Sequence, residues 1–160
     1  MLNYTTHESS TSSRFIITTP STNISILAFN RLDNEEMYFN NEFLQQNVVE
    51  MVVAKVTKNQ ENYCKEFALT IKHIFDHKLE KDENTIIYIC IPENSLKHQL
   101  MVRYIESDDN DHFKCLSFKV EDKVFCFFIN EQKTSTVKSW NSLVKFFKEE
   151  YEINFGTIDE

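Results

Sequence analysis

The sequence is almost without glycine. Its 160 residues contain one glycine, Gly156, and two prolines, Pro20 and Pro92. Phosphate-binding P-loops, dinucleotide fingerprints and nucleophile elbows each need two or more glycines, because their backbones turn sharply or approach a ligand where a side chain would collide. The sequence therefore excludes these three kinds of nucleotide-binding or catalytic motif.

Positive charge and long apolar runs are also scarce. The chain has 17 Lys and Arg against 25 Asp and Glu, a net charge of −8 and a sequence pI near 5.2. Nucleic acids and anionic membrane surfaces are bound through Lys and Arg, so neither partner is expected. The longest apolar runs, such as Ile86–Ile91 and Val124–Ile129, fall far short of the roughly 20 residues that span a bilayer. The first residues lack the basic and apolar regions of a secretory signal, and we expect none.

Cysteines are few and form no metal-binding or redox motif. Cys64, Cys90, Cys115 and Cys126 are spread along the chain without a CxxC pair. We interpret them as free, buried thiols in a reducing compartment. With 41% hydrophobic and 26% charged residues the composition is that of one globular domain, which needs no disulfide or metal to fold.

Hydrophobic periodicity predicts a domain between two terminal extensions. Residues 1–23 are rich in Ser and Thr and predict a flexible arm; the domain covers 24–130, and 131–160 form a C-terminal extension. Expected strands are Ile24–Phe29, Thr85–Ile91, Gln99–Glu106, His112–Val120 and Lys123–Ile129. Expected helices run from about Glu35 to Val56, from Tyr63 to Leu79 and, as an amphipathic stripe, from Lys138 to Tyr151.

This order of elements, β-α-α-β-β-β-β followed by a helix, predicts an α+β fold. The last two strands should form a hairpin about Glu121 and Asp122, despite the lack of glycine there. Val124–Ile129 is apolar on both faces, and we take this as a sign of burial against a second copy of the chain.

Several stretches, taken in order, resemble the small dynein light chains of roughly eight kilodaltons. They are Phe43–Glu50 and Phe67–Lys78 for that family's two helices, Ile86–Pro92 for a strand, and Asp111–Phe113 with Val124–Phe128 for the closing strands. The resemblance covers about residues 24–130. It departs from the family at 92–96, where two glycines are missing, and at Cys115 and Ser117, which replace paired tyrosines.

The resemblance implies two helices packed on an antiparallel sheet, in a dimer that binds extended peptides by strand addition. The implied peptide-binding residues are Lys65, Glu66, Leu100, Met101, Val102, Arg103, Tyr104, Ile105, Cys115 and Ser117. The implied dimer interface contains Val102, Tyr104, Phe125 and Phe127. The partners would be segments of dynein intermediate or heavy chains, other disordered peptides, and a second light chain.

The function expected on this basis is that of a non-catalytic adaptor in a microtubule motor or another assembly. It would act in the cytoplasm at the cytoskeleton, or in the cilium or axoneme, without cofactor or metal. Two related alternatives stay open, a Tctex-type light chain and a dimerisation hub outside dynein, and so does a small cytosolic enzyme of unknown chemistry. His73 and His77 have the spacing of zinc ligands on a helix, but they lie on its polar face without a third ligand. Ser95 and His98 lack the frame of a hydrolase, and the acidic 106–111 run lacks the glycine of a calcium loop.

Overall fold

A computed structural model describes residues 2–9, 12–18, 24–31, 39–55, 64–81, 85–95 and 112–159. The elements in chain order are β1 (Asn3–Glu8), β2 (Ser12–Thr18), β3 (Ile24–Arg31), α1 (Glu42–Asn47), β4 (Val48–Lys55), α2 (Cys64–Lys81), β5 (Ile86–Pro92), β6 (Phe113–Val120), β7 (Lys123–Asn130) and α4 (Thr136–Tyr151). No helix of this described part is long and apolar enough to cross a membrane.

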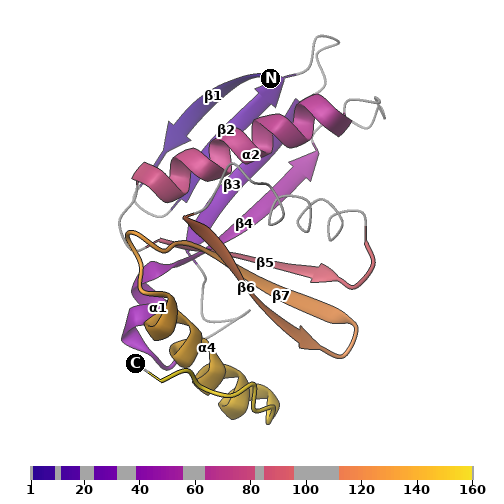
Figure 1. The fold of residues 1–160 in the computed structure, drawn as a ribbon. Helices are drawn as coiled ribbons and strands as arrows, with labels where there is room; N and C mark the ends of the chain where they lie inside the picture. Colours follow the sequence, from indigo (N-terminus) through magenta and orange to yellow (C-terminus); the bar gives the residue numbers. More distant parts are fainter. Residues whose placement is uncertain are drawn as a thin grey trace.

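The strands form one seven-stranded sheet in the order β1-β2-β3-β4-β5-β7-β6 (Figure 1). Neighbouring strands are antiparallel except β4 and β5, which are parallel. A parallel pair requires a crossover connection, and α2 lies in this one. The expected β-α-α-β-β-β-β domain with an antiparallel sheet is therefore wrong, because the sheet is mixed and includes two further strands from the N-terminal region.

Those two strands come from the region that the sequence analysis interprets as a flexible arm. β1 and β2 pair antiparallel, and β2 pairs with β3. Phe15 and Ile17 are buried, with 5% and 1% of their surface exposed, and the Phe15 ring packs edge-on against Phe29 at 5.8 Å. Alternation of Ser13, Phe15 and Ile17 toward the core is the two-residue period of a strand. The Ser- and Thr-rich composition of this region is also typical of a flexible segment, so it does not show the strand, although Thr is itself a strand former.

A second correction concerns the helix expected from about residue 35 to 56. The structure has a short helix there, α1, capped by the Asn41 side chain, and then the strand β4. Val48 belongs to the hydrophobic cluster under α4, whereas Val49 and Met51 pack against the cluster under α2. The run VVEMVVAK alternates between the two faces, and β-branched valines favour a strand.

Other expected elements agree with the structure. β5, α2 and α4 lie within about two residues of their predicted bounds. β6 and β7 form the predicted hairpin, from Val120↔Lys123 outward, and Glu121 adopts the left-handed φ of 57° that a glycine would usually supply. The expected strand Gln99–Glu106 lies outside the described residues.

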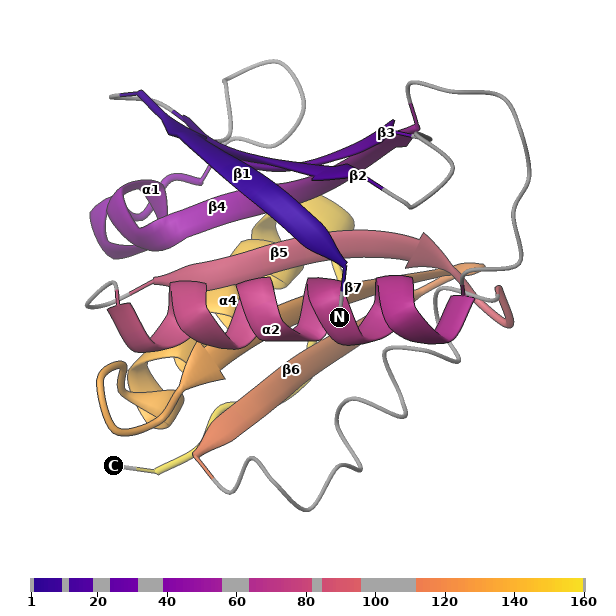
Figure 2. The ribbon, with the colours of Figure 1, turned by 90° about the horizontal axis from the view of Figure 1, so that it is seen from above.

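Two helices cover opposite faces of β5 and β7 (Figure 2). Phe125, Phe127 and Ile129 of β7 belong to the cluster under α4, and Cys126 and Phe128 belong to the one under α2. Typical contacts are Phe118–Phe147, with ring centroids 4.6 Å apart, and Phe75–Phe128 at 4.8 Å. The two apolar faces of β7 are thus covered by the chain's own helices, and their burial requires no second copy.

Candidate functional site

The parallel strands β4 and β5 pair over a short distance and then part. Their register is Val48↔Ile86, Val49↔Ile87 and Glu50↔Tyr88, and in the described part of the chain it ends there. β4 stays paired with β3 as far as Lys55, and β5 stays paired with β7 as far as Pro92. We call the region beyond Glu50 and Tyr88, formed by 51–55 of β4 and 89–92 of β5, the β4–β5 divergence. In Figure 1 the arrowheads of the two strands point apart.

Side chains from three elements lie on the α4 face of this divergence. Val48 and Tyr88 both belong to the cluster under α4, so strand alternation places Glu50, Val52 and Cys90 on the same face. Val52 is 40% exposed and Cys90 is exposed, although both lie on central strands. Tyr151, the last residue of α4, has its ring 5.6 Å from that of Phe125, the register partner of Cys90.

The electrostatics of this group keep two side chains protonated. Burial raises the pKa of Tyr88 well above its ordinary 10.0, and its hydrogen bond to Cys90 and the charges of Cys90, Glu50 and Tyr151 raise it further. Burial also raises the pKa of the Cys90 thiol, against the lowering effect of its hydrogen bond to Tyr88 and of the charge of Lys123. The phenol and the thiol therefore keep their protons at neutral pH and can donate hydrogen bonds, and the charge of Glu50 reaches both.

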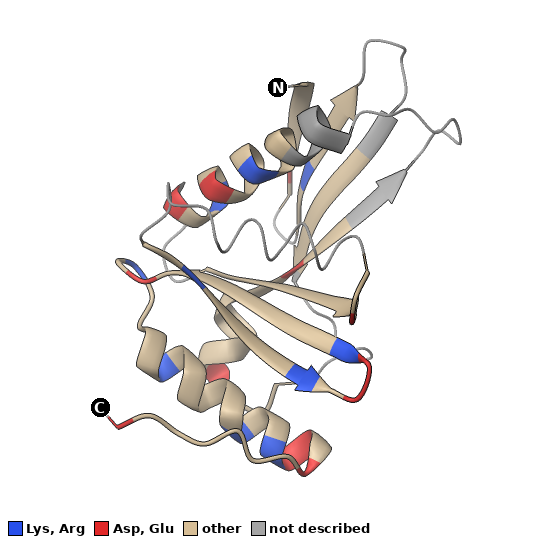
Figure 3. Ribbon diagram, turned by 45° about the vertical axis from the view of Figure 1, so that its right-hand side comes forward, with Lys and Arg blue, Asp and Glu red and all other residues tan. Residues whose placement is uncertain are grey.

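Charge around the divergence is unevenly distributed (Figure 3). Glu149, Glu150 and Glu152 lie at the C-terminal end of α4, next to Tyr151. Lys119 and Lys123 flank the Glu121-Asp122 turn of the β6–β7 hairpin, and Lys119 Nζ forms an ion pair with Glu93 at 2.8 Å. The end of α4 is consequently acidic, whereas the hairpin turn carries charges of both signs.

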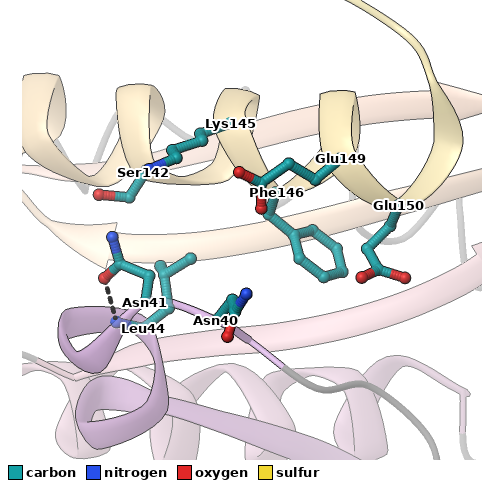
Figure 4. A pocket seen from close by; sticks show the side chains of 8 residues that line it. All are labelled: Asn40, Asn41, Leu44, Ser142, Lys145, Phe146, Glu149 and Glu150. Atoms are coloured by element: carbon teal, nitrogen blue, oxygen red, sulfur yellow. Dashed lines mark hydrogen bonds between the residues drawn. The ribbon is translucent and has the colours of Figure 1, made fainter.

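A small hollow between α1 and α4 is a packing gap (Figure 4). Its volume is about 70 Å³, against roughly 300–1,000 Å³ for a pocket that holds a small-molecule ligand. The amide oxygen of Asn41 accepts a hydrogen bond from the Leu44 N–H at 3.1 Å and so caps α1. The lining residues are Asn40, Asn41, Leu44, Ser142, Lys145, Phe146, Glu149 and Glu150.

The structure describes the positions of four of the ten expected peptide-binding residues. Leu100, Met101, Val102, Arg103, Tyr104 and Ile105 lie outside the described residues. Lys65 and Glu66 belong to the first turn of α2, and Cys115 and Ser117 lie on β6, the last strand of the sheet order. Phe125 and Phe127, expected at a dimer interface, lie under α4.

Residues at the divergence did not stand out in the sequence. Glu50, Tyr88, Cys90 and Tyr151 carry no motif, and Glu50 was assigned to a helix. The signal that could have revealed them is alternation: once 48–55 is recognised as a strand, Glu50 is a charged residue within an apolar run. No group of three or more His, Cys, Asp or Glu in the described part is placed to hold a metal ion.

Comparisons with known proteins found similarity in solved structures alone. No protein-family model matches the chain, and no curated protein does. One similar structure is a mutant of spermidine N-acetyltransferase SpeG from Vibrio cholerae, with 11% identity and a TM-score of 0.44, covering 81% of this chain and 71% of that one. Two chimeras of that enzyme and hSSAT have 12% identity, TM-scores of 0.40 and 0.42, and coverage of 79% and 78% of this chain and 71% and 69% of theirs.

The expected dynein light chain-like adaptor is therefore corrected. Residues 48–55, which the resemblance places partly in a helix, form a central strand, and the sheet has a different strand order. The expected non-catalytic role and the expected motor-chain partners rest on that resemblance and are corrected with it. The expected location, in the cytoplasm at the cytoskeleton or in the cilium or axoneme, stays a prediction.

Proposed function

We propose that the chain is an acyltransferase that binds an acyl thioester of coenzyme A at the β4–β5 divergence and transfers the acyl group to an amine. One observation carries the proposal. Two parallel central strands separate at the point where a carboxylate, Glu50, and a protonated phenol, Tyr88, are register partners.

The position of the divergence favours a ligand site. In open sheets that contain parallel strands, ligands bind beyond the carboxyl ends of the strands at the point where the connectivity changes. β4 and β5 share the first half of this description, because they are the parallel pair of the described sheet and their carboxyl ends part beyond Glu50 and Tyr88. Main-chain N–H and C=O groups of parting strands suit an elongated ligand with amides of its own, as in the pantetheine arm of coenzyme A.

The side chains fit the proton transfers that acyl transfer requires. In this reaction the amine nitrogen forms a bond to the thioester carbon, and the carbon–sulfur bond breaks. Glu50 accepts the proton that the amine loses, and the O–H of Tyr88 and the S–H of Cys90 donate hydrogen bonds that stabilise the departing thiolate. The raised pKa values of Tyr88 and Cys90 keep these protons in place at neutral pH.

The charges around the divergence favour a cationic acceptor, and the phosphates of coenzyme A would have to be bound by side chains. Glu150, whose charge reaches Tyr151, adds negative potential beside Glu50 and favours a cationic amine. Residues 56–63, which follow β4 in the sequence, contain no glycine. A glycine-rich phosphate-binding loop is therefore not part of the proposed site. Lys123, whose charge reaches Cys90, is a cation at the opposite side of the region.

The test combines binding and turnover. Calorimetry with coenzyme A and acetyl-coenzyme A measures binding, and release of free thiol in the presence of small amines, spermidine among them, measures transfer. Glu50→Gln should lower kcat by about 10²–10⁴-fold while leaving the Kd for acetyl-coenzyme A within about threefold, because the carboxylate acts on the acceptor. Glu42→Gln, on an exposed position of α1, is the matched control and should retain full activity.

Two results would contradict the proposal. If neither coenzyme A nor acetyl-coenzyme A binds at millimolar concentration, the proposed ligand is wrong. Binding without thiol release in the presence of any of the amines would leave a binding protein without the proposed catalysis.

A further inference from the structure

Three soft or polar side chains gather on the α2 face of the β6–β7 hairpin. The Sγ of Cys115 lies 3.3 Å from the Oγ of Ser117, and that hydroxyl donates to the Sγ of Cys126 at 4.0 Å. Cys115 and Ser117 are two apart on β6, and Ser117 is the register partner of Cys126 on β7. The β4–β5 divergence does not use these residues, because Cys126 belongs to the cluster under α2 and Cys90 lies on the other face.

The group is accessible from the sheet edge. β6 is the last strand in the sheet order, with β7 as its neighbour. Exposure falls from Ser117, which is exposed, through Cys115, which is half-buried, to Cys126, which is 2% exposed. An ion approaching along β6 meets the hydroxyl first and then the two thiols.

The register opposes a disulfide between these thiols. The pairs are Cys115↔Phe128 and Ser117↔Cys126, so the two cysteines are diagonal and not opposite. Diagonal neighbours have Cβ atoms somewhat less than about 7–8 Å apart, whereas a disulfide requires roughly 3.5–4.5 Å. A metal between the sulfurs spans more, because two metal–sulfur bonds of about 2.3 Å place the sulfurs up to ~4.6 Å apart, against about 2.05 Å in a disulfide.

We propose that Cys115 and Cys126 form a binding site for a soft monovalent metal ion, Cu(I), with Ser117 beside it. Thiolates select soft ions such as Cu(I), and this ion is satisfied by two ligands, whereas structural zinc requires four. Binding converts two thiols and one Cu(I) into a bis-thiolate complex and releases two protons. The inference is independent of the acyltransferase proposal.

The test is a titration of the reduced, full-length chain with Cu(I) in competition with a chromogenic Cu(I) chelator. We expect one tightly bound Cu(I) per chain. Cys115→Ser and Cys126→Ser should each weaken binding by at least about 100-fold, because each removes one of two thiolates. Cys90→Ser, on the other face of the sheet, is the matched control and should bind as the natural chain does.

Ser117→Ala covers the case in which a cysteine variant fails to fold, because residue 117 is exposed. Loss of its hydrogen bonds to the sulfurs should weaken Cu(I) binding by about 10-fold, as for other groups that orient metal ligands. The proposal is overturned if Ser117→Ala and a folded cysteine variant both bind Cu(I) unchanged, or if Cys90→Ser removes the site. Complete formation of a Cys115–Cys126 disulfide in the folded chain under mild peroxide would overturn the geometric argument.

Discussion

At the scale of single residues, Tyr88 connects the packing of the sheet with its candidate chemistry. Its ring stacks on that of Phe127 with centroids 5.0 Å apart, and 6% of the residue is exposed. Its phenol is hydrogen-bonded to Cys90 and lies within the field of Glu50. The residue that helps to hold β5 to β7 is thus also the residue that faces the β4–β5 divergence.

Tyr88 should make the chain sensitive to alkaline pH. Its pKa is higher in the folded chain than the ordinary 10.0, so the unfolded chain loses its proton first. This contribution to stability is complete below about pH 10 and is lost as the pH rises further. Urea unfolding between pH 8 and pH 11 should show the decline, and Tyr88→Phe should make it shallower while costing about 1 kcal/mol at pH 7 through the lost hydrogen bond. An equal decline in the variant would mean that other groups cause it.

Phe147 is the residue whose removal should cost most on the α4 face. It is fully buried, and its ring lies 4.6 Å from Phe118, 5.2 Å from Phe125 and 5.5 Å from Tyr151. Phe147→Ala should lower the free energy of unfolding by about 3–5 kcal/mol. Lys148→Ala, at the exposed next position, should change it by about 0.5 kcal/mol or less. Chemical denaturation of both variants checks this, and a loss below about 1 kcal/mol for Phe147→Ala would show that α4 does not pack as described.

At the scale of elements, α4 is capped at its N-terminus and is also held by the segment that follows it. Ser135 is its N-cap, and its Oγ accepts a hydrogen bond from the Lys138 N–H at 3.2 Å. In the second turn of the helix, the Asn141 side chain holds the main chain of Ile158 by two hydrogen bonds of 2.9 and 2.8 Å. The Phe155 ring lies 5.0 Å from Phe118, so the last residues lie across the helix and the aromatic cluster.

Removing the cap should destabilise α4 measurably. Ser135→Ala leaves the Lys138 N–H without its side-chain acceptor, and we expect a cost of about 1 kcal/mol, or roughly 2–4 °C in Tm for a chain of this size. Ser135→Asn keeps an acceptor and should stay close to the natural Tm. A thermal melt in which both variants behave alike would argue against the cap.

The Asn141 contacts should determine how firmly the C-terminal segment is held. Asn141→Ala removes both hydrogen bonds to Ile158, so amide exchange at 153–158 should accelerate by about 10-fold, which corresponds to about 1.4 kcal/mol of local stability. Asn141→Asp retains the acceptor and loses the donor, and an intermediate rate is expected. Unchanged exchange in Asn141→Ala would show that Phe155 alone fixes the segment.

The sequence predicted the elements whose pattern is local. The apolar stripes of α2 and α4 and the hairpin β6–β7 follow from periodicity and turn position, and the structure confirms them. β4 was misassigned because five valines spaced along 48–56 satisfy a helical stripe as well as a strand alternation. β1 and β2 were missed because their polar faces are Ser and Thr, as in an unstructured arm.

Local sequence patterns could not predict the candidate site. It depends on a parallel pairing between β4 and β5, which α2 separates in the chain, and no local signal sets that pairing. Glu50 acquires a possible role only when Tyr88 is known to be its register partner. The resemblance to dynein light chains aligned helices and strands in order, but order along the chain does not determine their neighbours in the sheet.

At the scale of the whole molecule, the sheet joins two halves through β4 and β5. β1 to β4 form one antiparallel half, and β5, β7 and β6 form the other (Figure 1). The halves share a ladder of three residue pairs, short in comparison with the eight pairs that join β6 and β7. A short junction between two well-paired halves leaves room for the strands to part, and the proposed ligand site lies where they do.

Hydrogen exchange with and without coenzyme A tests this claim most directly. If the pantetheine arm lies between the strands, amides in Met51–Lys55 and in Ile89–Ile91 should both gain protection when the ligand is added, while those of β1 and β6 stay unchanged. Protection confined to other elements, or binding of coenzyme A without slower exchange in either strand, would contradict the placement of the site at the β4–β5 divergence.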